Sequence, residues 1–367
     1  MRLANVVGTR PQLIKAAALQ PALGASHEEI FIDTGQHWDE SMAGTFFREL
    51  GLRAPDRTLG IGGGTAADQT GRMLVALENA LRDLAPDAVV VYGDTNSTLA
   101  ATLVAAKMDV PVAHVEAGLR SFDRRMPEEV NRIVTDHLAR WRFAPTDRAV
   151  TNLAAEGLTD GVHRVGDVMR DLAARALPGV RDVSALGDLV GIAGGGLRTG
   201  EFLFATVHRA ENRAPDAIRG WIGVLDAMAR ADRPVVLALH PGTREALDAL
   251  GVVPSSNVLI VEPLGYRTSL AAQLHAAAVL TDSGGVQREA AWLGTPCLVL
   301  RGTTEWLEAT EGDDATSVLV GLDAARARDA LDRLAPADRA PAEAARRARE
   351  RTIDTDGATE SIARLLA

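Results

Sequence analysis

Short apolar runs rich in β-branched residues alternate along the chain with longer segments of helical periodicity. This alternation is typical of strand–helix units that build a parallel sheet. Because the runs are apolar at almost every position, we expect helices to cover both faces of each sheet. The predicted strands are Leu3–Val7, Glu29–Asp33, Ala88–Tyr92, Val112–Val115, Phe202–Val207, Val235–Leu239, Val258–Val261, Val279–Thr281 and Cys297–Leu300.

The pattern repeats in two halves, which predicts two similar α/β domains facing one another across a central cleft. The length of 367 residues agrees with two domains at about 150 residues each. We expect an N-terminal domain over 1–166 and a C-terminal domain over 167–351. The glycine-rich segment Gly191–Gly196 is predicted to be a surface loop. A last helix within about 352–367 is expected to pack back on the N-terminal domain.

Composition narrows the classes of function. The net charge of −10 offers no bulk positive field for nucleic acid or for an anionic membrane, so neither is an expected partner. No apolar run reaches the ~18 residues of a membrane span, and the N-terminal run is too short for a signal peptide. With Cys297 as the single cysteine, no intrachain disulfide can form. These observations favour a cytoplasmic protein.

Polar and ionisable residues gather directly after the predicted strands. In open parallel sheets ligands bind beyond the carboxyl ends of the strands, so this distribution predicts a binding site at one edge of each sheet. The residues that follow the strands of the first half include Arg10, Lys15, Gln36, His37, Asp94, Glu116, Glu128 and Arg132. Those of the second half include His208, Arg209, His240, Ser283, Gly284, Gly285, Glu289 and Arg301.

Each of these residues also has a purely structural explanation. Asp94 could simply cap the helix that follows it. Glu116 is harder to explain in this way, because a carboxylate directly after an apolar strand is costly unless it is paired or used. Arg10 starts a predicted helix, where the macrodipole disfavours a cation unless an anion is bound.

The same alternatives hold in the second half. Ser283-Gly284-Gly285 opens a helix and leaves backbone N–H groups for phosphate oxygens, or it is an ordinary capped helix start. His208 and His240 are either site residues or satisfied core histidines. Cys297 lies in an apolar run and is expected to be buried packing. The chain has no zinc-type ligand spacing, and Gly60–Gly64 lacks the spacing of a dinucleotide fingerprint, so no metal or nicotinamide cofactor is expected.

Taken together, these segments resemble the non-hydrolysing UDP-N-acetylglucosamine 2-epimerases. The segments that carry the resemblance run in the family's order: Gly8-Thr9-Arg10-Pro11 with Lys15, Gly35-Gln36-His37, Gly93-Asp94-Thr95, His114-Val115-Glu116-Ala117-Gly118-Leu119-Arg120, Pro127-Glu128-Glu129 with Asn131-Arg132, His208-Arg209 with Glu211-Asn212, and Asp282-Ser283-Gly284-Gly285 with Gln287 and Glu289. The resemblance implies a glycosyltransferase-B type fold with two Rossmann-like domains. It also implies a homodimer that interconverts UDP-N-acetylglucosamine and UDP-N-acetylmannosamine, or a close UDP-amino sugar.

The resemblance further implies anti elimination of UDP to a 2-acetamidoglucal, followed by re-addition. Catalytic roles fall on Asp94, Glu116, Glu128 and His208. The residues implied for substrate or UDP binding are Arg10, Lys15, Arg132, His240, the backbone N–H groups of Ser283, Gly284 and Gly285, Glu289 for the ribose, and Arg301. A second substrate site, used for regulation in many bacterial members, implies Gln36, His37 and Arg209.

The sequence departs from the family pattern at several positions. Trp306 replaces an arginine of the family. The family often has Thr-Glu-Arg-Pro-Glu at this point, where the chain has Thr304-Glu305-Trp306-Leu307-Glu308. Asp39 and Gly62–Gly64 stand where a glutamine and an arginine are expected near the second site. We therefore predict weakened regulation by a second substrate molecule.

Three other functions stay open at the level of sequence. A glycosyltransferase of the same architecture would transfer the sugar to an acceptor, and a hydrolysing epimerase would release it. A degenerate nucleotide-sugar-binding module would bind UDP without reaction. Neither the pathway that uses the product nor the modification state of the sugar is fixed by the sequence.

Overall fold

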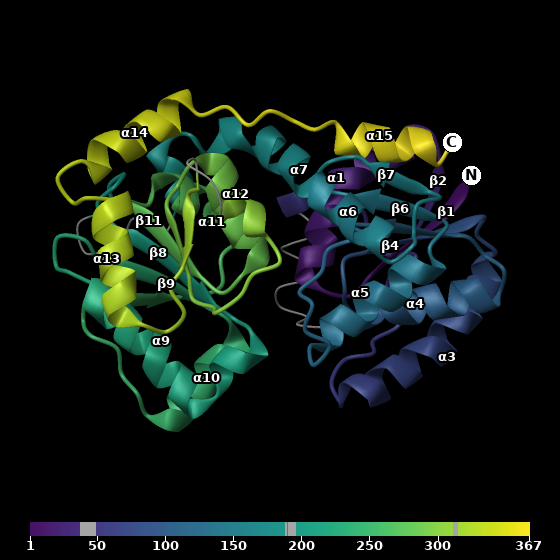
Figure 1. Cartoon of the computed structure of the whole chain (residues 1–367), viewed down its shortest axis with the longest axis horizontal. Coiled ribbons are helices and arrows are strands. Elements are labelled where there is room, and N and C mark those ends of the chain that lie inside the picture. Colours follow the sequence, from purple (N-terminus) through teal and green to yellow (C-terminus); the bar gives the residue numbers. More distant parts are fainter. Residues whose placement is uncertain (37–48, 188, 190–195, 311–314) are drawn as a thin grey trace. The chain divides into compact units, whose positions relative to one another are not determined.

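The computed structural model (Figure 1) describes residues 1–36, 49–187, 189, 196–310 and 315–367. The chain divides into two compact units: unit 1 is Met1–Leu172 with Asp354–Ala367, and unit 2 is Ala173–Ile353. Of the predicted features, His37, Asp39 and most of the Gly191–Gly196 loop lie outside the described residues. Among the helices in these ranges, none has the length and low charge needed to cross a bilayer.

Unit 1 is built on a seven-stranded sheet with the order β3-β2-β1-β4-β5-β6-β7. All of its neighbouring strands pair in parallel. The strand order reverses between β1 and β4, and this reversal marks the position where ligands bind in doubly wound sheets. Its strands are β1 (Arg2–Val7), β2 (Glu28–Asp33), β3 (Arg57–Thr58), β4 (Ala88–Tyr92), β5 (Val112–Val115), β6 (Trp141–Ala144) and β7 (Val162–Arg164).

Three helices of unit 1 begin at threonine caps that the sequence provides. Thr65, Thr95 and Thr146 each accept a hydrogen bond from a backbone N–H in the first turn of the helix that follows. The helices are α1 (Arg10–Gly24), α3 (Ala66–Leu84), α4 (Asn96–Lys107), α5 (Pro127–Leu138), α6 (Asp147–Ala155), α7 (Val168–Ala176) and α15 (Ala358–Leu365). The chain passes from unit 1 to unit 2 within α7.

Alternate residues of the strands enter two separate hydrophobic clusters. In β4, Val90 belongs to one cluster, whereas Val89 and Val91 belong to the other. The period of two therefore buries both faces of the sheet. The last helix, α15, places Ile362 in the first cluster with Leu19 of α1, and the two helices lie side by side (Figure 1).

Unit 2 has a six-stranded parallel sheet with the order β10-β9-β8-β11-β12-β13. The order reverses between β8 and β11, as it does between β1 and β4 in unit 1. The strands are β8 (Leu203–Val207), β9 (Val235–Leu239), β10 (Val258–Val261), β11 (Ala278–Thr281), β12 (Cys297–Val299) and β13 (Ser317–Leu319).

Helices and short 3-10 turns connect these strands. The α-helices are α9 (Pro215–Met228), α10 (Pro241–Leu250), α11 (Tyr266–His275), α12 (Gly284–Leu293), α13 (Ala324–Leu334) and α14 (Ala340–Glu350). The 3-10 turns are η1 (Leu177–Val180), η2 (Val183–Leu186), η3 (Ala210–Arg213) and η4 (Leu307–Ala309).

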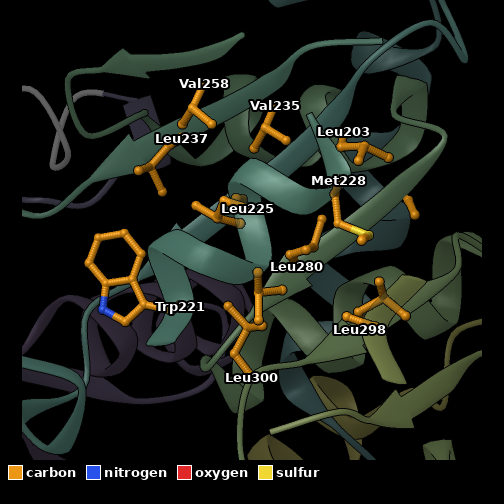
Figure 2. Packing of buried hydrophobic residues seen from close by; sticks show 14 of the residues in the cluster. Leu203, Trp221, Leu225, Met228, Val235, Leu237, Val258, Leu280, Leu298 and Leu300 are labelled. Atoms are coloured by element: carbon orange, nitrogen blue, oxygen red, sulfur yellow. The ribbon is translucent and has the colours of Figure 1, made fainter. Parts of the chain in front are cut away.

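The core of unit 2 fixes the segment that follows β8. Figure 2 shows Trp221 and Leu225 of α9 in one cluster with Val235 and Leu237 of β9. Trp221 is fully buried, and its indole N–H donates to the carbonyl of Asn212 at 3.0 Å. A core side chain thus holds η3, the turn that follows His208 and Arg209.

Cys297 is expected to resist thiol reagents in the native protein. The residue is buried in β12, and burial raises the pKa of its thiol to about 12. Iodoacetamide at pH 8 should therefore modify Cys297 only after denaturation, as measured by intact mass. Rapid modification of the folded protein would contradict this placement.

Candidate active site

Two carboxylates of unit 1 stand at the carboxyl ends of β4 and β5. Asp94 lies in the turn after β4, and Glu116 directly follows β5. Glu116 has φ of 75°, a left-handed conformation that costs a non-glycine residue about 1–3 kcal/mol. The backbone N–H groups of Glu116 and Ala117 both donate to the carbonyl of Phe143 at 3.1 Å, which holds this turn in place. Strain of this kind persists where the surroundings enforce it, and it is concentrated at functional sites.

The carboxylate of Glu116 forms an ion pair with the ammonium of Lys15. The two side chains are 10% and 9% exposed, so both charges are largely removed from water. The pair lies over Gly93, where φ is 59° and where an added Cβ would sit 3.0 Å from Lys15 Nζ. Glycine at this position therefore allows both the turn and the close approach of the ion pair.

Asp94 is held by Arg132, a buried arginine of α5. Arg132 Nη1 donates to Asp94 Oδ2, and Arg132 Nε donates to Glu129 Oε2 at 2.9 Å. Glu129 also accepts hydrogen bonds from the backbone N–H groups of Ser121 and Phe122, each at 2.9 Å. Burial alone would raise the pKa of Glu129, but the hydrogen bonds from Ser121 and Arg132 outweigh it and lower the pKa. The Asp94 side chain stays 35% exposed, so a ligand can reach it.

Behind these residues lies a buried network centred on Asp136. His114 contacts the carbonyl of Gly93 through Nε2 at 2.8 Å and Asp136 Oδ1 through Nδ1 at 2.7 Å. The other oxygen of Asp136 accepts from Gly118 N at 3.1 Å and from Arg120 Nη1 at 2.7 Å. Burial opposes ionisation of Asp136, yet His114 and Arg120 lower its pKa. The network thus fixes the backbone on both sides of the strained turn.

The other predicted residues of unit 1 have different surroundings. Glu128 is exposed in the first turn of α5, and within the described ranges no hydrogen bond or ion pair is recorded for it. Arg10 is the first residue of α1 and is half-buried. The buried side chain of Gln36 accepts from the N–H and hydroxyl of Ser97 at 2.9 and 2.7 Å. The structure therefore pairs Glu116 with Lys15 and Asp94 with Arg132, and records no such contact for Glu128 within the described residues.

In unit 2, Asp282 clamps the segment that follows β8. Its carboxylate accepts from the backbone N–H groups of His208 at 3.1 Å and Arg209 at 3.0 Å. It also accepts from Asn212 Nδ2 at 2.8 Å. The His208 ring lies 3.5 Å from Asp282 through Nδ1 and remains 39% exposed. The backbone of His208 is thus fixed while its ring stays accessible.

Two arginines of unit 2 share one buried carboxylate. Glu305 accepts from Arg209 Nη2 at 2.9 Å and pairs with Arg301 Nη1 at 2.7 Å. Burial would raise the pKa of Glu305, but the two guanidinium groups lower it to about 2. Arg301 and Arg209 are therefore held in place by an ionised carboxylate.

This arrangement predicts a specific loss of stability in acid. The usual pKa of a glutamate is 4.5, and that of folded Glu305 is about 2. Because the folded pKa is depressed, the stabilisation is complete above pH 4.5 and is lost as the pH falls toward 2. Urea unfolding of Glu305→Gln should show a lower midpoint at pH 7 and a shallower decline between pH 4.5 and 2 than the native protein. If the urea midpoints of the two proteins fall in parallel between pH 4.5 and 2, the prediction is contradicted.

The start of α12 combines small residues with a helix N-terminus. Ser283 caps the helix by accepting from Val286 N at 3.4 Å, and its own N–H donates to Thr281 Oγ1 at 2.9 Å. Within the described residues, no acceptor is recorded for the N–H groups of Gly284 and Gly285. These two donors at the positive end of the helix suit an anion.

Two further predicted residues lie elsewhere in unit 2. Glu289 is buried in α12 and accepts from Gln273 Nε2 at 2.6 Å. His240 is exposed at the start of α10, where its ring accepts from Gly242 N at 3.3 Å. Across the part of the chain that the structure describes, no group of three His, Cys, Asp or Glu side chains could hold a metal ion.

Several residues that organise the two halves were not predicted as site residues from the sequence. Glu129, Asp136 and Asp282 are buried, and the side chain of Glu305 is only 8% exposed. These carboxylates hold the backbone or the arginines of the site. Glu129, Asp282 and Glu305 lie within the segments that we compared with the family pattern. Asp136 lies outside them, and sequence alone does not show which cation or N–H group each carboxylate meets.

Two doubly wound parallel sheets, each with polar residues at its switch point, define a glycosyltransferase-B type α/β protein. The glycosyltransferase SnogD from Streptomyces nogalater shares this fold, with a TM-score of 0.55 and 17% identity over 100% of this chain and 98% of that chain.

Within that class the chain belongs to the UDP-N-acetylglucosamine 2-epimerase family, whose model matches residues 22–367. The UDP-2,3-diacetamido-2,3-dideoxy-D-glucuronate 2-epimerase of Pseudomonas aeruginosa is 41% identical over 97% of this chain and 95% of that protein. The structure of UDP-GlcNAc 2-epimerase from Methanocaldococcus jannaschii, in complex with UDP-GlcNAc and UDP, has a TM-score of 0.86. It is 35% identical and covers 100% of this chain and 99% of that chain. The predicted family and fold class are thus confirmed.

Proposed function

We propose that the chain is a non-hydrolysing 2-epimerase that interconverts UDP-N-acetylglucosamine and UDP-N-acetylmannosamine, or a close UDP-amino sugar. Family membership supports the reaction class. The observation that carries the proposal is the strained Glu116, paired with Lys15 beside the Asp94–Arg132 pair at the switch point of unit 1.

Epimerisation at carbon 2 needs an indirect route, because this carbon is not next to a carbonyl and its proton is weakly acidic. In the proposed route a base removes the carbon 2 proton, and the C–H electron pair becomes the C1=C2 double bond. The bond from carbon 1 to the phosphate oxygen breaks with its electrons leaving on UDP. The intermediate is a 2-acetamidoglucal. Re-addition of UDP to carbon 1, with a proton delivered to the opposite face of carbon 2, completes the inversion.

We assign the proton transfers to Asp94, Glu116 and Glu128, each of which is a carboxylic acid or carboxylate. General acid–base groups typically contribute about 10²–10⁴-fold. Lys15 and Arg132 orient the first two carboxylates through the ion pairs described above. Glu128 has no such partner within the described residues, so its role depends on a bound substrate.

We assign the diphosphate to a cradle of unit 2 formed by the N–H groups of Gly284 and Gly285 and the ring of His208, and we assign Arg10 of unit 1 to the same ligand. The net charge of −10 makes such local groups necessary for an anionic ligand. We assign Glu289, which accepts a hydrogen bond from Gln273, to the ribose hydroxyls. We propose that the carboxylates of unit 1 and the cradle of unit 2 act on the same nucleotide sugar. We further propose that the enzyme is a cytoplasmic homodimer.

The sugar itself has a second candidate. The Pseudomonas relative is named for a UDP-2,3-diacetamido-2,3-dideoxy-D-glucuronate substrate and is 41% identical. A UDP-2-acetamido sugar with further groups at carbons 3 and 6 would undergo the same chemistry at carbon 2. Comparing kcat/KM for the two sugars separates the candidates.

Deuterium exchange tests the reaction directly. The protein is incubated with UDP-N-acetylglucosamine alone in deuterium oxide, and the products are followed by proton NMR. We expect both epimers, with deuterium at carbon 2 and the nucleotide still attached. Free N-acetylmannosamine with UDP would indicate a hydrolysing enzyme. No exchange with either sugar would favour a transferase, if transfer appears when acceptors are added, or a binding module, if UDP binds tightly without turnover.

A further inference from the structure

Trp306 is a loop residue whose side chain is only 7% exposed. It lies between β12 and η4, and its backbone is tied to its surroundings at both ends. Trp306 N donates to Thr304 Oγ1 at 3.2 Å, and its carbonyl accepts from Gln287 Nε2 at 3.5 Å. Because Gln287 belongs to α12, the indole is fixed against that helix.

The edge of the indole that carries Nε1 and Cδ1 faces the first residue of α12. A Cβ added at Gly284 would lie 3.1 Å from Trp306 Nε1 and 3.2 Å from Cδ1, so glycine at this position leaves room for the ring edge. Within the residues that the structure describes, no acceptor is recorded for this N–H, and it is not among the fully buried unpartnered groups. The N–H therefore still reaches solvent beside the start of α12. An acceptor carried by a ligand can meet it there.

The electrostatics at this position favour an anionic acceptor. The guanidinium carbon of Arg288 lies 3.8 Å from the centre of the Trp306 ring. The N–H groups of Gly284 and Gly285 stand at the positive end of the α12 dipole, in the same turn that the indole approaches. Three N–H donors and a cation thus lie near the start of α12.

We propose that the Trp306 indole N–H binds the diphosphate of the substrate by donating a hydrogen bond to a phosphate oxygen. This inference rests on the proposed function, because it takes UDP as the ligand at the start of α12. The donor is neutral, so it adds direction and a hydrogen bond to the cradle without adding a charge.

The test compares UDP with uridine, which lacks phosphates, by isothermal titration calorimetry. Trp306→Phe keeps an aromatic ring beside Arg288 and removes the N–H. It should bind UDP about tenfold more weakly, a loss typical of one hydrogen bond to a charged group. Its affinity for uridine should be unchanged. Trp306→His retains a ring N–H and should recover part of the affinity for UDP.

Trp292→Phe is the matched control, since Trp292 lies in the last turn of α12 and faces Arg288 at 5.8 Å. It should bind both ligands as the native protein does. The proposal is overturned if Trp306→Phe binds UDP within twofold of the native protein, or if it loses UDP and uridine equally. If the native protein itself binds no UDP, the nucleotide assignment fails together with the proposal.

A measurement on the native protein covers the case in which Trp306→Phe does not fold. The indole ¹⁵N–H resonance of Trp306, assigned with Trp→Phe variants at the other tryptophans, should move downfield when UDP is added and not when uridine is added. A resonance that UDP leaves unmoved would also overturn the proposal.

Discussion

Glu116→Gln should slow deuterium exchange at carbon 2 by about 10²–10⁴-fold, the range typical of a lost general acid–base group. Glutamine preserves the size of the side chain and a hydrogen bond to Lys15, but it cannot take up a proton at neutral pH. Affinity for UDP should stay within about twofold, because the cradle assigned to the diphosphate lies in other segments of the chain. The measurement is the initial rate of exchange by NMR, together with calorimetry for UDP.

The matched control is Glu78→Gln. Glu78 also pairs with a cation, Arg82 at 2.7 Å, but the pair is exposed on α3. Exchange should proceed at the native rate in this variant. An exchange rate for Glu116→Gln within threefold of the native rate would contradict the assignment of Glu116 as an acid–base group.

Asp136→Asn should cause the largest loss of stability in unit 1. Asp136 is fully buried between His114 and Arg120, and it also accepts from Gly118 N. Removing one partner of a buried charged network typically costs about 3–5 kcal/mol, since it leaves a buried charge uncompensated. For a unit of this size that corresponds to a fall of roughly 6–20 °C in the apparent melting temperature.

The control for this variant is Asp68→Asn. Asp68 pairs with Arg72 at 2.9 Å, but both side chains are exposed on α3. Exposed pairs contribute little, so its melting temperature should lie within about 2 °C of the native value. Differential scanning calorimetry measures the melting temperatures of both variants. If both fall by a similar amount, burial of Asp136 is not the cause of the loss.

The central strands were predicted from the sequence because their apolar runs are nearly continuous. β4, β5, β9 and β10 have the predicted bounds, whereas β12 ends at Val299 and not at Leu300. Strands β3, β6, β7 and β13 were not predicted. β3 has two exposed residues, and β6 contains the buried but charged Arg142, so neither shows an apolar run.

The site was predicted only in part, because the sequence does not show which side chains form ion pairs with one another. Asp94, Glu116 and the start of α12 follow strands, and this position can be read from the sequence. The partners of a buried charge cannot be read in this way, because they come from distant segments. Lys15 meets Glu116 and Arg132 meets Asp94 only once the sheet has formed. Trp306 appeared in the sequence as a departure from the family pattern, and its contact with Gly284 becomes visible only in the fold.

Positional isotope exchange tests the central claim, that UDP leaves carbon 1 and returns to it. UDP-N-acetylglucosamine is prepared with ¹⁸O in the oxygen that bridges carbon 1 and the β-phosphate. If the bond breaks and re-forms, rotation of the released phosphate moves the label into non-bridging positions of the recovered nucleotide sugar. We predict that this scrambling accompanies formation of the 2-epimer, as followed by ³¹P NMR. A product epimerised at carbon 2 with the label still wholly in the bridging position would contradict the account.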